Sequence, residues 1–177
     1  MKRFKFQLLI VMLISLILVQ TSPTYAYELL PSSQRWGSNV HWDKDSYFYL
    51  SYQTQVDNAM YAWNATPTKA YVWYDAGCLS DVSTRSLPND TWYGSYYRGI
   101  GYYDITLNDY RLYQDYGSSG YDNAKQSTMV HEWGHALGLG DQPNGSTMIM
   151  GYGRDRTTMI TPQQDDIDGV NAIYGAP

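Results

Sequence analysis

The amino-acid sequence predicts a single α+β domain in which a β-sheet packs on two helices and a third helix closes the chain. Several short segments alternate apolar and polar residues, as half-buried strands do, and others repeat their apolar residues at helical spacing. Residues 27–177 are numerous enough for one domain with a substantial core, and no repeat, low-complexity tract or linker divides them.

The first 26 residues predict an export signal. A basic start at 2–5 precedes an almost wholly apolar stretch at 6–19, and Thr24-Tyr25-Ala26 offers small residues at the −3 and −1 sites for cleavage before Tyr27. The apolar stretch is shorter than the roughly 20 residues that span a membrane, and no cysteine follows it directly for a lipid anchor. We therefore expect residues 27–177 to be secreted as an extracellular protein with no stable membrane anchor.

Strands and one helix are predicted in the first part of the domain. Ser46–Tyr52 alternates in the manner of a strand, and a helix capped by Thr54 follows it. Apolar residues lie at i, i+3, i+4 and i+7 from Val56, and the helix stops before Pro67. The predicted strands are 46–52, 70–75, 91–97 and 102–107.

The next predicted helix, capped by Asp122, carries the segment His131-Glu132-Trp133-Gly134-His135. Positions i and i+4 lie on one face of a helix, so both imidazoles can bind the same metal ion. The Glu132 carboxylate lies beside the first histidine, where it can accept a proton from a water at the metal. The chain holds only three histidines and two glutamates, so the pattern is specific, and it predicts a zinc hydrolase.

The third metal ligand is predicted at Asp141. Gly138 follows His135 by three residues and can take the positive φ that ends a helix, so the chain can turn back toward the metal. Aspartate oxygen binds zinc at about 2.0–2.2 Å, and three protein ligands leave one position open for water. No glutamate follows position 132. Rival carboxylates lie at the start of the last helix, where acids are favoured without any metal; they are Asp165, Asp166 and Asp168.

The last predicted helix begins after Thr161, its N-cap, with Pro162 in the first turn and Gln164 completing a capping box. Gly175 ends it. Its apolar side is formed by Ile167, Val170 and Ile173.

These motifs together resemble the metzincin zinc metallopeptidases, and most closely the catalytic domain of matrixins. Most of that clan has histidine as third ligand; Asp141 in its place resembles the snapalysin-type bacterial proteases. The segment 146–152 is similar to the Met-turn, whose methionine lies beneath the ligands as a soft apolar base, and Met150 fits that turn better than Met148. Residues 101–108 and 161–175 also resemble the corresponding matrixin strand and closing helix.

The resemblance implies a twisted, mostly parallel sheet, with the active-site cleft between sheet and third helix. It implies a zinc-dependent endopeptidase with one catalytic Zn²⁺, Glu132 as general base and a protein or peptide substrate. Tyr152 is a candidate oxyanion stabiliser. In such a fold the substrate pairs along a sheet edge, for which we expect 91–97. A monomer is expected.

Other features are given simpler interpretations. A net charge of −5 disfavours nucleic acid and anionic membranes as partners. Cys78, the only cysteine, is expected to be a plain buried thiol rather than a latency switch. His41 is expected in a polar loop with a surface role. Asp115 and Asp122 offer a candidate Ca²⁺ loop without an EF-hand pattern.

A second class of function, sugar binding, is also compatible with the composition. Aromatic residues make up 16% of the chain, which suits a secreted carbohydrate- or cell-wall-binding protein on a non-catalytic metzincin scaffold, because rings stack on sugar faces. Such a module would have no reason to carry the zinc motif. A chelator separates the two classes, since it would stop a metallopeptidase and leave a sugar binder unchanged.

Overall fold

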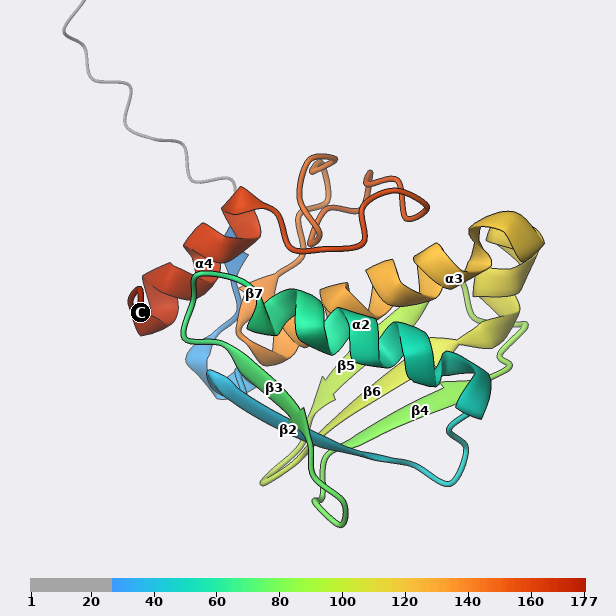
Figure 1. Ribbon diagram of the computed structural model, residues 1–177, viewed down its shortest axis with the longest axis horizontal. Coiled ribbons are helices and arrows are strands. Elements are labelled where there is room, and N and C mark those ends of the chain that lie inside the picture. Colours follow the sequence, from blue (N-terminus) through green and yellow to red (C-terminus); the bar gives the residue numbers. More distant parts are fainter. Residues whose placement is uncertain (1–26) are drawn as a thin grey trace, which may run out of the picture.

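The computed structural model describes residues 27–177, so the export signal predicted for 1–26 lies outside the described part. A five-stranded sheet in the order β3-β2-β4-β6-β5 forms the centre of the fold, and helices α2 and α3 cover one of its faces (Figure 1). The strands are β2 (Asn39–Lys44), β3 (Tyr71–Tyr74), β4 (Asp81–Arg85), β5 (Gly94–Arg98) and β6 (Tyr103–Asn108), and the helices are α2 (Gln53–Asn64), α3 (Asp109–Ala136) and α4 (Gln164–Tyr174).

The sheet is parallel except at one edge. Strands β3, β2, β4 and β6 run in parallel, and β5 pairs antiparallel with β6 and with no other strand of the described residues. The predicted α+β fold with a mostly parallel sheet is confirmed. The strand expected at 91–97 is the edge strand β5, although it begins only at Gly94.

A second, two-stranded sheet joins the start of the domain to the segment after α3. Strand β1 (Glu28–Leu29) pairs antiparallel with β7 (Leu139–Gly140), which directly follows α3. Single 3-10 turns lie at η1 (Ser32–Gln34) and η2 (Leu50–Tyr52). Among the helices of the described residues, none is long and apolar enough to cross a membrane.

The core lies between the sheet and the two covering helices. Val40 and Trp42 point from β2 to the same side because alternate residues of a strand share a face, and both are fully buried. Trp42 packs against Trp133 of α3, with ring centroids 5.9 Å apart. The indole of Trp63, from α2, donates a hydrogen bond to the carbonyl of Val130 over 2.9 Å, which fixes α2 against α3.

The first predicted strand was wrong, and one strand was missed. Residues 39–44 form the strand instead of 46–52. Residues 46–49 are a loop, in which the backbone N–H groups of Tyr47 and Tyr49 donate hydrogen bonds to Asp45 and Thr84, and residues 50–52 form η2. Strand β4 has the sequence Asp-Val-Ser-Thr-Arg, so its polar residues concealed it, although Ser83 and Thr84 are buried.

Three predicted helix caps were also wrong. Helix α2 begins one residue before Thr54 and has no side-chain cap. Helix α3 begins at Asp109, capped by Asn108, and is kinked at Gly117; Asp122 lies inside it and pairs with Lys125 over 2.7 Å. In α4 the cap is Gln163 rather than Thr161, because the capping box is completed by Asp166.

Candidate active site

Helix α3 presents two histidines on one face. His131 and His135 are buried, and their rings lie 4.7 Å apart between centroids at 80° to each other. The Nδ1 of His131 is 3.0 Å from the carbonyl oxygen of Ile149, and the Nδ1 of His135 is 2.9 Å from that of Leu139. A carbonyl only accepts, so each Nδ1 carries the proton and each Nε2 offers a lone pair for a metal.

The chain turn after α3 brings Asp141 to these nitrogens. Gly138 takes the positive φ expected of it, 102°, and the chain passes through β7 back toward the helix. The Oδ1 of Asp141 lies 3.2 Å from Nε2 of His131 and 3.5 Å from Nε2 of His135. One ligand atom from each residue lies within 4.8 Å of the others. Three lone pairs that face one another in this way fit a Zn²⁺ ion.

The rival carboxylates have other partners. Asp166 accepts hydrogen bonds from the backbone N–H groups of Ile149, Met150 and Gln163 over 2.8, 3.2 and 2.7 Å. Asp168 accepts from the side chain of Gln164 at the surface. In the described part of the chain, no group of three metal-ligand side chains includes Asp165, Asp166 or Asp168.

The candidate calcium residues are likewise paired with protein groups. Asp115 contacts Arg111 over 2.9 Å and accepts a hydrogen bond from the hydroxyl of Tyr93. Asp122 contacts Lys125. Neither aspartate belongs to a group of three metal-ligand side chains within residues 27–177.

Met150 lies directly against the metal-ligand segment. A Cβ added to Gly134, which sits between the two histidines, would overlap the sulfur of Met150. Met148 instead lies near Gly145, in the loop before the turn. The absence of a side chain at position 134 therefore allows the thioether to pack beneath the ligands.

Glu132 lies buried between α3 and the edge strand. Among residues 27–177 its Oε2 has no hydrogen-bond donor, and burial raises the pKa of the carboxyl to about 7. A Cβ on Gly94 of β5 would overlap Oε1, so the glycine makes room for the carboxylate. A carboxyl with its proton affinity raised toward neutral pH is suited to accept and later release a proton.

The charges around the cluster set the protonation of the ligands. Burial and the charge of Arg154 lower the pKa of His131 to about 3, so this imidazole is neutral. Burial raises the pKa of Asp141, but its contacts with the two histidines outweigh that effect and hold the pKa well below the usual range. For His135 burial lowers the pKa, yet contact with Asp141 and the charge of Glu132 raise it overall. A metal ion bound by the two imidazoles would compete with protons for the same nitrogens, so metal binding would weaken as the pH falls.

Arg154 was not anticipated from the sequence. It is 4% exposed, and its guanidinium donates to Oγ of Ser127 over 3.2 Å and to the carbonyl of Gly151 over 2.8 Å. Burial lowers its pKa to about 9. These contacts tie α3 to the turn that contains Met150. An arginine in a polar loop carries no sequence signal for this role.

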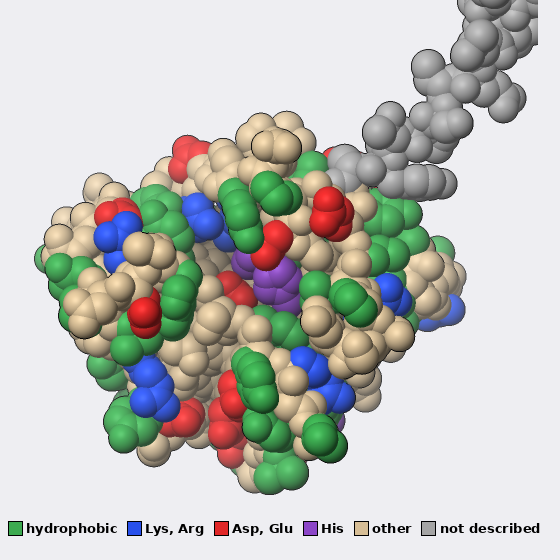
Figure 2. Space-filling view, turned by 180° about the vertical axis from the view of Figure 1, so that it is seen from behind, with side chains coloured by type: hydrophobic (Ala, Val, Ile, Leu, Met, Phe, Trp, Pro, Cys, Tyr) green, Lys and Arg blue, Asp and Glu red, His purple; other side chains and the backbone are tan. Residues whose placement is uncertain are grey.

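The cluster opens into a cleft of about 640 Å³ between α3 and β5, and Figure 2 shows histidine side chains at the bottom of a hollow on this face. Tyr152 lines the cleft and is half exposed; burial and a hydrogen bond with Asp141 raise the pKa of its hydroxyl. Along the opposite wall runs the segment Trp92–Arg98, most of which is β5.

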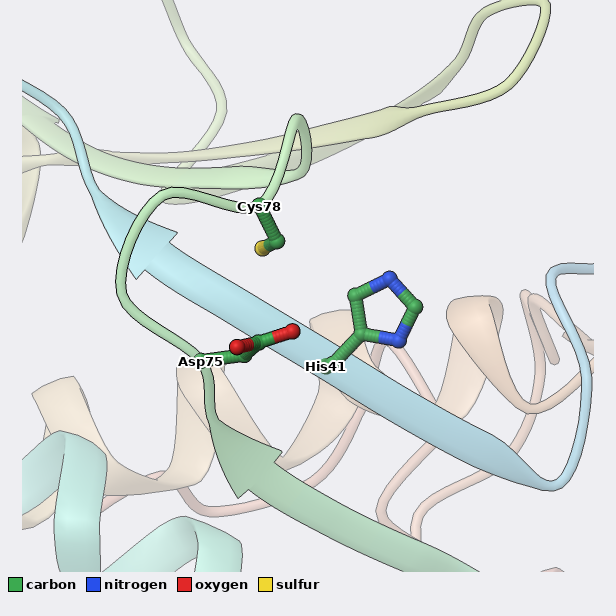
Figure 3. Close-up of side chains that lie close together, drawn as sticks. All are labelled: His41, Asp75 and Cys78. Carbon is green, nitrogen blue, oxygen red and sulfur yellow. The ribbon is translucent and has the colours of Figure 1, made fainter.

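His41 and Cys78 differ from expectation. His41 belongs to strand β2 rather than to a polar loop, and Cys78 is half-buried in the loop between β3 and β4. Both lie close to Asp75, and the three residues form the other group of metal-ligand side chains in the described chain (Figure 3). None of them lines the cleft.

Comparison with known proteins gives similarities at three levels. Human neutrophil collagenase is 45% identical over 47 residues, which are 26% of this chain and 10% of that protein. One chain of the GM1-bound form of the ECX AB5 holotoxin superposes with a TM-score of 0.58 at 16% identity, with 84% of each chain covered. High choriolytic enzyme 1, a hatching enzyme zinc-protease from the medaka fish Oryzias latipes, superposes with a TM-score of 0.50 at 15% identity, covering 90% of this chain and 99% of that one.

These structural likenesses, at such low identity, establish the fold alone. The matched segment spans only a tenth of the collagenase. The family match is much wider, since residues 20–175 match the Matrixin (Peptidase_M10) family. The chain belongs to the matrixin family of peptidases.

Proposed function

We propose that this protein is a secreted zinc-dependent endopeptidase whose metal ligands are His131, His135 and Asp141. The observation that carries the proposal is the convergence of these three side chains beside a buried carboxyl, Glu132, one oxygen of which has no hydrogen-bond partner in the described part of the chain. Membership of the matrixin family supports it. Release from the cell rests on the predicted signal at 1–26.

The residues of the cleft have separate tasks in peptide hydrolysis. A zinc ion, when bound, would polarise the substrate carbonyl and make a water more acidic. Glu132 accepts a proton from the attacking water and delivers it to the leaving amine. Met150 supports the histidines from below. Tyr152, exposed at the cleft, is placed to donate its hydroxyl proton to the developing oxyanion.

The open edge of β5 supports binding of the substrate as an added strand. Because β6 is the one strand within residues 27–177 that pairs with β5, the backbone groups of the other edge of β5 face the cleft. An extended peptide would hydrogen-bond to them and lie across Glu132. Trp92, Tyr93 and Tyr96 line the same cleft, so we expect apolar or aromatic residues beside the scissile bond.

The decisive test compares Glu132→Gln with the wild type on a denatured general protein substrate. We expect a fall in kcat/KM of about 10²- to 10⁴-fold, because the general base is removed, with zinc content unchanged by elemental analysis. Glu28→Gln is the matched control, since Glu28 is the only other glutamate and lies exposed in β1. Zinc-loaded wild type that fails to cut any peptide bond would contradict the proposal.

The sugar-binding alternative receives no support from the surface. The exposed aromatic side chains are scattered over different elements, for example Tyr61 on α2, Tyr71 on β3 and Tyr97 on β5. A binding platform would require them to form one face.

A further inference from the structure

A second group of possible metal ligands lies on the sheet, outside the cleft. The side chains of His41, Asp75 and Cys78 each offer one ligand atom within 4.8 Å of the others, and all three are half-buried. Figure 3 shows the three side chains close together beside β2, with the Asp75 carboxylate extending toward the His41 ring and the Cys78 thiol on the loop above them. The three residues come from a strand, the end of the next strand and the loop that follows it.

The parallel pairing of β2 with β3 explains why they meet. His41 stands opposite Trp73 in the register, and the N–H of Asp75 donates to the carbonyl of Trp42 over 2.8 Å. Val40 and Trp42 point into the core, so His41 points to the opposite face, away from the helices. Position 75 is two residues beyond Trp73 and therefore shares that face.

A tight turn then places the thiol. The N–H of Cys78 donates to the carbonyl of Asp75 over 3.1 Å, with Gly77 at a φ of 87° between them. This is the arrangement of a four-residue turn that requires glycine at its third position. The resulting Asp-x-x-Cys spacing equals the two-residue spacing of paired ligands in many zinc sites.

Neighbouring groups hold the turn and the imidazole in place. The carboxylate of Asp43 accepts hydrogen bonds from the N–H groups of Gly77 and Lys44, each over 2.7 Å, which leaves it to position the turn rather than to bind an ion. The His41 ring packs against Trp36 at 5.2 Å and Trp73 at 5.9 Å between centroids. In metal sites, contacts of this kind orient the side chains that bind the ion.

We propose that His41, Asp75 and Cys78 form a second metal site that binds a zinc-class divalent ion. Thiolate, imidazole and carboxylate form a mixed donor set that suits borderline ions such as Zn²⁺ and Co²⁺, whereas Ca²⁺ and Mg²⁺ take oxygen ligands only. On binding, the thiol releases its proton to solvent and the sulfur lone pair binds the ion. One thiolate and one carboxylate neutralise the double positive charge. The site is independent of the proposed peptidase activity.

Cobalt spectroscopy tests this site separately from the cleft. The purified full chain, reduced with a phosphine and freed of metal, would be titrated with Co²⁺ and followed in the near ultraviolet. Cys78 is the only cysteine, and the cleft cluster contains no sulfur, so a thiolate-to-cobalt charge-transfer band can arise only at this site. We expect such a band, and two zinc ions per chain by elemental analysis after zinc loading.

Variants distinguish binding of the metal ion by these three side chains from unspecific attraction of cations to an acidic surface. Cys78→Ser should abolish the band and lower the zinc content from two ions to one. Asp75→Asn should weaken cobalt binding at least about tenfold. Asp81→Asn is the matched control, because Asp81 is a half-buried carboxyl nearby on β4 that lies outside the cluster; it should keep the band.

Two results would overturn the proposal. One is a chain with demonstrably reduced Cys78 that shows no charge-transfer band and binds a single zinc ion. The other is equal weakening by Asp81→Asn and Asp75→Asn, which would indicate unspecific attraction. Absorbance and metal content report on the site even if the protein hydrolyses no peptide.

Discussion

The two groups of metal-ligand side chains differ in how firmly the protein holds them. In the cleft, both histidines are anchored through Nδ1 to backbone carbonyls, and they lie buried on one rigid helix. On the sheet face, the ring of His41 is held by packing alone among the contacts described above, and Asp75 and Cys78 lie in a half-buried turn. A preorganised set of ligands loses less free energy on binding its ion.

The contrast also shows two ways in which a sequence encodes such a cluster. The cleft takes two ligands from one helical segment, so their spacing is visible in the sequence. The group of His41, Asp75 and Cys78, here named the sheet-face cluster, exists only because β2 and β3 pair in one particular register. Four experiments test whether the two clusters differ in this way.

The largest effect concerns activity on metal removal. Chelation should reduce peptide hydrolysis to background, and one equivalent of zinc per chain should restore it fully, because the anchored ligands of the cleft fill first. The second equivalent should add nothing. Hydrolysis measured during a zinc titration checks this. Activity that returned only with the second equivalent would reverse the order of the two sites.

The second-largest effect is a change in the free energy of unfolding when Glu132, beside the buried cluster, is replaced. In metal-free protein, Glu132→Gln should be more stable than wild type by up to roughly 3 kcal/mol at pH 8, since the folded pKa of Glu132 is about 7 against 4.5 for the free group. A raised carboxyl pKa favours folding below 4.5 and loses that contribution as the pH rises through 7. At pH 4 the two proteins should therefore unfold alike in urea. An equal difference at both pH values would show that ionisation is not the cause.

Packing beneath the histidines gives a smaller effect. Gly134→Ala should destabilise the protein by about 1–3 kcal/mol, because the new methyl would overlap the sulfur of Met150. In a protein that already carries Met150→Ala, the substitution Gly134→Ala should cost less, since the space is then free. Thermal unfolding of the single and double variants measures the coupling, and strictly additive losses would argue against this contact.

The smallest effect is expected at the corresponding glycine of the sheet-face cluster. A methyl on Gly77 would meet nothing within 4 Å, but its φ of 87° is unfavourable for alanine. Gly77→Ala should therefore cost only about 1 kcal/mol. Because the turn positions Cys78, the same variant should weaken the cobalt–thiolate band. If the variant bound cobalt with unchanged affinity, the turn would not be what positions the thiol.

Much of the cleft could be predicted from the sequence because its elements are local. The helical spacing of His131 and His135 and the turn at Gly138 predicted side chains that the structure brings together with Asp141. The predicted fold class is confirmed, because the three helices and the strands β3, β5 and β6 were predicted close to their places.

The remaining features depend on contacts between distant segments. Strand β4 is polar, and its place in the middle of the sheet follows from pairing with β2 and β6. Asp166 was predicted to be an acid of the first turn of α4. The N–H groups of Ile149 and Met150, from which it accepts hydrogen bonds, belong to another part of the chain. Arg154 and Cys78 likewise gain their surroundings only after folding.

Asp166 also has a consequence for the order of events during synthesis. The turn beneath the histidines is held by a carboxylate from α4, which the ribosome makes after the histidine motif. A nascent chain that has just exposed the histidine motif therefore lacks the group that fixes its support. We expect hydrolytic competence to arise only after α4 has emerged and docked, so that an incomplete chain would not digest its surroundings.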